Sequence, residues 1–139
     1  MHLLLLIAAL GGSASSVTAD RVKLQAALLR IEAAQGYTLH EIQSATGTTV
    51  REYVSSSGDV FAVAWSGPAI PDLRQVLGDY FATYQTAVDA SRAARRARGP
   101  LSIDTADFVI QVSGHMRSFA GRAYLKRLMP AGVQPSAIR

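Results

Sequence analysis

The sequence predicts a single α+β domain in which one antiparallel sheet carries a long helix packed on one of its faces. Three observations support this fold class. Apolar residues recur every three or four positions between residues 73 and 88, as they do in an amphipathic helix. Runs of β-prone residues separated by short turns occupy residues 37–66 and 107–122. The 139 residues suit one core, and no internal repeat divides them.

The composition is that of a folded protein, with 49% apolar and 17% charged residues. Its net charge of +4 comes from a local cluster, Arg92, Arg95, Arg96 and Arg98, without which ten basic residues face ten acidic ones. A basic cluster confined to seven residues argues against the whole domain being a nucleic-acid surface. Cysteine is absent, which excludes disulfides, thiolate metal sites and cysteine nucleophiles.

The first 19 residues predict an export signal, and residues 20–139 form the expected domain. Leu3 to Leu10 are all apolar, and small residues follow up to Ala19. A bilayer span needs about 20 apolar residues, so the run suits the core of a secretory signal. Ala9, Ala14 and Ala19 are candidate cleavage positions; the alternative is a buried N-terminal strand or half-helix. We expect a periplasmic or secreted protein in which residues 1–19 are either a signal-like segment or a signal truncated at the start of this sequence.

The first predicted element is an N-terminal helix from Asp20 to Gln35, which Gly36 would stop. Its apolar stripe, at spacings of three and four, consists of Leu24, Ala27, Leu28 and Ile31.

A three-stranded antiparallel meander is predicted next, over Tyr37–Ser44, Thr48–Val54 and Val60–Trp65. Strict alternation in the third strand would place Phe61, Val63 and Trp65 on one face. Val60, Ala62 and Ala64 would occupy the other face. Because both faces are apolar, we expect an interior strand with another element packed on its Phe61 and Trp65 side.

The long amphipathic helix is the strongest periodic signal in the chain. Pro71 and Asp72 mark its start, and the Arg92 to Arg98 cluster continues it until Gly99-Pro100. Its apolar stripe is Leu73, Val76, Leu77, Tyr80, Phe81, Tyr84 and Val88.

A C-terminal β-hairpin completes the predicted fold. Asp107–Ser113 and Met116–Arg122 alternate in polarity, with a turn at Ser113-Gly114-His115. An apolar tail around Tyr124 to Met129 predicts one helical turn before Pro130.

Several segments resemble an uncharacterised exported proteobacterial family, domain of unknown function 2844. The likeness covers nearly the whole chain and is carried by Thr48–Val54, Val60–Pro68, Pro71–Phe81, Met116–Tyr124 and Leu128–Val133. The resemblance implies a secreted or periplasmic protein whose mature part begins near an Ala-Leu-Gly-Gly segment, here Ala9 to Gly12. Only eight residues precede Ala9, which is the departure from the family pattern. The family has no assigned catalytic residues, so none is transferred.

Two groups of residues are candidate sites. His40, Glu41 and Glu52 form a candidate acid and base set if the first two strands pair in register, although charged residues on a wet sheet face are commoner. The Arg92, Arg95, Arg96 and Arg98 cluster is a candidate binding site for phosphates or anionic headgroups, against the simpler interpretation of a solvated helix end. No metal-ligand spacing and no nucleotide-binding glycine motif occurs, so we expect no metal and no cofactor.

The sequence therefore predicts an exported cell-envelope protein that acts as a non-enzymatic binding or accessory module. A small periplasmic hydrolase using His40, Glu41 and Glu52 is one alternative. A binder of anionic lipid or nucleic acid through the arginine cluster is another. The expected partner is an unidentified envelope protein or ligand; a membrane surface remains open as a partner, and nucleic acid has little support because no aromatic side chain interrupts the cluster. The sequence does not reveal the oligomeric state.

Overall fold

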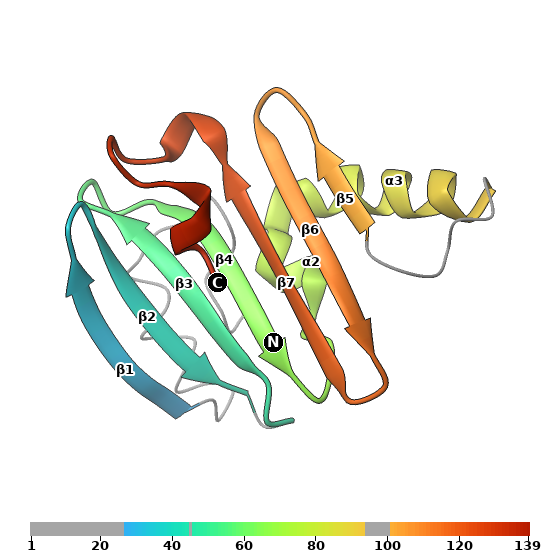
Figure 1. The fold of residues 1–139 in the computed structure, drawn as a ribbon, viewed down its shortest axis with the longest axis horizontal. Helices are drawn as coiled ribbons and strands as arrows, with labels where there is room; N and C mark the ends of the chain where they lie inside the picture. Colours follow the sequence, from blue (N-terminus) through green and yellow to red (C-terminus); the bar gives the residue numbers. More distant parts are fainter. Residues whose placement is uncertain (1–26, 45, 94–100) are drawn as a thin grey trace, which may run out of the picture.

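One seven-stranded antiparallel sheet dominates the protein (Figure 1). The computed structural model describes residues 27–44, 46–93 and 101–139. Across the sheet the strands follow the order β1-β2-β3-β4-β7-β6-β5. The strand bounds are β1 Ala27–Ala34, β2 Tyr37–Gln43, β3 Thr49–Ser55, β4 Val60–Gly67, β5 Leu101–Asp104, β6 Phe108–His115 and β7 Ser118–Leu125.

The two faces of the sheet are covered by different parts of the chain (Figure 1). Helices α2, Leu73–Leu77, and α3, Phe81–Ala93, lie on one face, which we call the helix face. The last ten residues, which include the 3-10 turn Pro135–Ala137, lie on the opposite face over β3 and β4. We call this second face the C-terminal face. Each face has its own apolar cluster, so the sheet is the central layer.

The predicted N-terminal helix is wrong over the described part of its range, because residues 27–34 form the edge strand β1. The strand pairs with β2 from Ala34 opposite Tyr37 to Ala27 opposite Gln43, across a two-residue turn in which Gly36 has a φ of 91°. Gly36 therefore turns a hairpin instead of ending a helix. Ile31, which the helical stripe would bury, is 55% exposed. Residues 20–26 and the predicted signal segment 1–19 lie outside the described residues.

Strands β2, β3 and β4 occupy the three predicted strand regions, but the alternation in β4 is broken. Tyr53 pairs with Ala62 whereas Val54 pairs with Val60, so Phe61 is an extra residue in the ladder. Such a bulge shifts the side-chain alternation by one position. Val60 therefore joins Val63 and Trp65 in the helix-face cluster, and Phe61 packs with Ala62 and Ala64 on the C-terminal face.

The long amphipathic helix is also a wrong prediction, because the segment is interrupted. Helix α2 has five residues, and the Asp72 side chain caps it by accepting from the Arg74 amide at 3.0 Å. Gly78 follows with a φ of 56°, and a 3-10 turn, Gly78–Tyr80, joins α2 to α3. A positive φ ends an α-helix, and glycine adopts it at little cost.

Packing of the interrupted segment still follows the predicted stripe. Leu73, Val76 and Leu77 are buried in the same cluster as Trp65 and Val63. Tyr80, Phe81 and Tyr84 are partly buried against that cluster. The predicted contact between this segment and the Trp65 side of the sheet is therefore present, but Phe61 takes no part in it.

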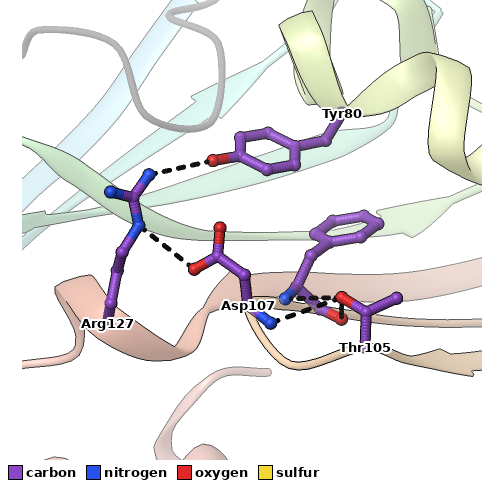
Figure 2. Close-up of polar contacts among 5 residues, drawn as sticks. Tyr80, Thr105, Asp107 and Arg127 are labelled. Atoms are coloured by element: carbon purple, nitrogen blue, oxygen red, sulfur yellow. Dashed lines mark hydrogen bonds and ion pairs between the residues drawn. The ribbon is translucent and has the colours of Figure 1, made fainter.

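Tyr80 connects the 3-10 turn to the start of β6 and to the turn that follows β7 (Figure 2). Its ring stacks on Phe108 with 5.2 Å between centroids, and its hydroxyl accepts from the Arg127 guanidinium at 3.4 Å. Arg127 also donates to Asp107 at 3.1 Å, and these two partners raise its pKa. Thr105 closes the β5–β6 turn: its hydroxyl donates to the Phe108 carbonyl and accepts from the Phe108 amide, both at 3.0 Å.

The C-terminal hairpin is longer than predicted and its turn lies further along the chain. Strand β6 runs through the expected turn to His115, and Met116-Arg117 makes the turn, with a φ of 63° at Arg117. Tyr124 and Leu125 belong to β7, and a 3-10 turn, Lys126–Leu128, follows them. Strand β5 was not predicted.

The predicted fold class as a whole is wrong, because the described chain is mostly strand and carries only short helices. The hairpin joins the meander through the antiparallel pairing of β4 with β7, from Ala62 opposite Tyr124 to Gly67 opposite Phe119. No helix within the described ranges is long and apolar enough to cross a membrane.

Candidate functional site

The predicted set of His40, Glu41 and Glu52 is divided between the two faces of the sheet. His40 lies directly opposite Glu52, and both are on the helix face, since Ile42 and Val50, two positions further along each strand, belong to the helix-face cluster. Glu52 is fully buried. Glu41 lies on the C-terminal face, where its carboxylate is 3.8 Å from the Arg51 guanidinium. The sheet thus brings His40 and Glu52 together and separates Glu41 from them.

The His40 imidazole is partly buried, and its Nδ1 atom has no hydrogen-bond partner among the described residues. Burial disfavours the charged imidazolium and so lowers the pKa of His40. A neutral imidazole beside a buried carboxyl could transfer protons, so a catalytic role for this pair stays a prediction. Within the described part of the chain, no group of three His, Asp or Glu side chains could hold a metal ion.

Most of the predicted arginine cluster lies outside the described residues. Arg92 lies in the last turn of α3, and Arg95, Arg96 and Arg98 lie outside the described residues. Binding of anionic lipid or nucleic acid by this cluster stays a prediction.

A row of polar side chains crosses the C-terminal face, and sequence reasoning missed it. The strand registers place Arg51 next to Ala64, Ala64 next to Arg122, and Arg122 next to Gln111. Ser102 ends the row on β5, opposite Gln111. The Arg122 Nε atom donates to the Gln111 amide oxygen at 2.8 Å. Arg51 and Arg122 thus lie two strands apart on one surface.

The last residues of the chain are bound to this row. Arg122 Nη1 donates to the carbonyl oxygens of Pro135 at 2.7 Å and Ile138 at 3.2 Å. The Tyr53 hydroxyl donates to the Arg139 main-chain oxygen at 3.0 Å and accepts from the Arg139 amide at 3.1 Å. Arg51 donates to the same oxygen. Ile138 is fully buried in the apolar cluster of this face, which anchors the segment.

Between this segment and the strands β4, β7, β6 and β5 lies an open groove of about 560 Å³. Its volume is within the range of small-molecule sites. The polar part of its lining includes Arg51, Arg122, Arg139, Ser66, Gln111 and Ser113. The apolar part includes Leu101, Val112, Ala120, Gly121 and Ile138. Among the described residues that line it, three have positively charged side chains and none has an acidic side chain.

The groove forms where β4 meets β7, a pairing between residues more than 50 positions apart. The only local signal in the sequence was the alternation in residues 116–122, which puts Ala120 and Arg122 on one face of a strand. Nothing local indicates that Arg51, Ser66 and Arg139 join them.

Comparisons with known proteins found a family but no relative of known role. Searches of curated proteins and of solved structures found no match. A family model described as a protein of unknown function (DUF2844) matches residues 7–138. Since this match covers nearly the whole sequence, the chain belongs to the DUF2844 family.

Proposed function

We propose that this protein is an exported, non-enzymatic binding or accessory module of the cell envelope, and that it binds its ligand in the groove on the C-terminal face. The groove is the observation that carries the proposal. It combines a volume of about 560 Å³, hydrogen-bond donors and an apolar floor, which together characterise ligand sites. The apolar run from Leu3 to Leu10 supports export.

The hydrolase alternative has weaker support. None of His40, Glu41 and Glu52 is among the described residues that line the groove, and Glu41 lies on the opposite face of the sheet from His40 and Glu52. A catalytic acid or base must come within hydrogen-bond reach of the reacting atom. A hydrolase would need these residues to reach a substrate, whereas ligand binding in the groove does not depend on them.

Cell fractionation tests the compartment. The protein is expressed from its natural gene with the native upstream sequence, and an antiserum detects it, because a C-terminal tag would disturb the Arg139 contacts with Tyr53. Recovery from the periplasm or medium with a shortened N-terminus, measured by mass spectrometry, supports export. Recovery of the full-length chain only in the cytoplasm refutes it.

A ligand-observed NMR fragment screen tests the binding site. Ala120 is exposed in the groove, so Ala120→Trp should fill the space and abolish binding of the fragments found with the wild type. Ala82→Trp, on the exposed side of α3, is the matched control and should leave binding unchanged. Fragments that bind both variants equally, or an absence of any bound fragment, would refute the groove as the binding site.

A further inference from the structure

The Arg122 guanidinium is held in the groove by neutral acceptors alone. Its partners are the Gln111 amide and the carbonyls of Pro135 and Ile138. In the described ranges no carboxylate lies within ion-pair distance of it, whereas Arg51 has Glu41. A guanidinium fixed by neutral groups keeps its full charge and is oriented before any ligand arrives.

The hydrogen bonds around Arg122 leave donors available to the groove. Its Nη2 atom makes no hydrogen bond to any described residue. Because Gln111 accepts through Oε1, its amide nitrogen remains a donor. The hydroxyls of Ser66 and Ser113 line the same groove and can donate as well. A cluster of donors with one unneutralised cation selects a ligand with anionic oxygens.

Beside these donors the groove has an apolar floor. Ala120 and Gly121 on β7 and Ile138 from the C-terminal segment line it. A free inorganic anion would leave this surface in contact with water. A ligand with a carboxylate and an apolar body would cover the floor and reach the donors together.

We propose that the groove binds an organic carboxylate with an apolar body, with Arg122 Nη2 and the Gln111 amide nitrogen as its main donors. This inference rests on the proposed binding function and names the ligand class for the same site. The planar guanidinium fits two carboxylate oxygens, which favours this class over a neutral ligand.

NMR titration of the ¹⁵N-labelled full chain tests the inference with three probes: hexanoate, 1-hexanol and inorganic phosphate. We expect hexanoate to shift the amide resonances of Gln111, Ala120 and Gly121 and to bind at least about ten-fold more tightly than either other probe, because a hydrogen bond to a charged partner is stronger than a neutral one. Hexanol lacks the charge, and phosphate lacks the apolar body.

Two variants and one control locate the interaction. Arg122→Gln should weaken hexanoate binding about ten-fold or more. Gln111→Glu keeps an oxygen acceptor for Arg122 and thus the anchoring of the C-terminal segment, but it replaces the amide donor with a negative charge. Gln111→Glu should therefore abolish hexanoate binding, and this variant tests the inference even if Arg122→Gln fails to fold. Arg117→Gln, at the exposed tip of the β6–β7 hairpin, removes the same charge and should change nothing.

The outcomes separate this inference from the proposed function. Hexanol binding as tightly as hexanoate, phosphate binding as tightly as hexanoate, or a Gln111→Glu variant with unchanged affinity overturns the carboxylate assignment. If fragments are still lost in Ala120→Trp, the binding function stands while the ligand class falls. If no fragment depends on Ala120, the binding function itself falls.

Discussion

An alanine at position 121 would place a Cβ atom inside the indole of Trp65. Gly121 on β7 lies opposite Trp65 on β4, and the indole covers the glycine. An added Cβ would lie 2.3 Å from Cζ2, 2.6 Å from Cε2 and 3.0 Å from Cη2 of Trp65. Carbon atoms in contact are normally about 3.5–4.0 Å apart, so the nearest pair would overlap by about 1.2 Å or more.

The Trp65 side chain cannot move aside easily, because it is 1% exposed and packed within the helix-face cluster. Overpacking a well-packed core typically costs about 1–3 kcal/mol. We expect Gly121→Ala to lower the free energy of unfolding by about 3 kcal/mol, at the upper end of that range, because the clash involves a rigid ring. Urea denaturation followed by fluorescence measures it, since Trp65 is the only tryptophan.

A double-mutant cycle assigns the loss to this contact. Trp65→Phe removes the atoms that overlap. The loss of unfolding free energy in the double variant, measured by circular dichroism, should therefore be smaller than the sum of the two single losses by more than about 1 kcal/mol. Gly58→Ala is the control: its φ of 92° strains an alanine, but no atom lies within 4 Å of the added Cβ. Trp65→Phe should not relieve that cost. A Gly121→Ala protein within about 0.5 kcal/mol of the wild type, or strict additivity, would refute the packing of Trp65 over Gly121.

Two further changes test the C-terminal segment and the partly buried imidazole of His40. Ile138→Ala should lower the free energy of unfolding by about 2–5 kcal/mol, because Ile138 is fully buried; a urea midpoint equal to that of the wild type would mean that the segment is not docked. The lowered pKa of His40 means that the unfolded chain binds a proton more readily than the folded one below the unfolded pKa of about 6.5. Stability from this group is therefore complete above that pH and is lost as pH falls through it towards the folded pKa. Urea midpoints at pH 7.5 and 5.0 should differ less for His40→Gln than for the wild type; equal differences would contradict a partly buried imidazole with a lowered pKa.

Local patterns located β2, β3 and β4 because turn residues and β-prone runs act over a few positions. The same local signals misassigned residues 27–34, where an apolar stripe at three- and four-residue spacing is short enough to fit either a helix or a strand. These residues form a strand because they pair with β2, and the spacing of apolar residues within one segment carries no information about such pairing. The bulge at Phe61 and the break at Gly78 are likewise invisible to a periodic pattern, since each shifts the phase at one residue.

The residues of the candidate site could be predicted from local patterns even less well than the strands could. Strand pairing in the meander could be anticipated, and it correctly implied that His40 could lie near Glu52. The groove could not be anticipated, because Arg51, Arg122 and Arg139 come from segments that only the β4–β7 pairing and the docked C-terminal residues bring together.

By itself, the sequence determined the family, the meander and the apolar residues of the α2 segment that pack on Trp65, since these depend on residues close together in the chain. Only the tertiary structure decided the seven-stranded order, the face on which Phe61 lies and the residues that form the groove. These features depend on pairings between distant segments, whose free energy comes from burial and hydrogen bonds that no local window contains.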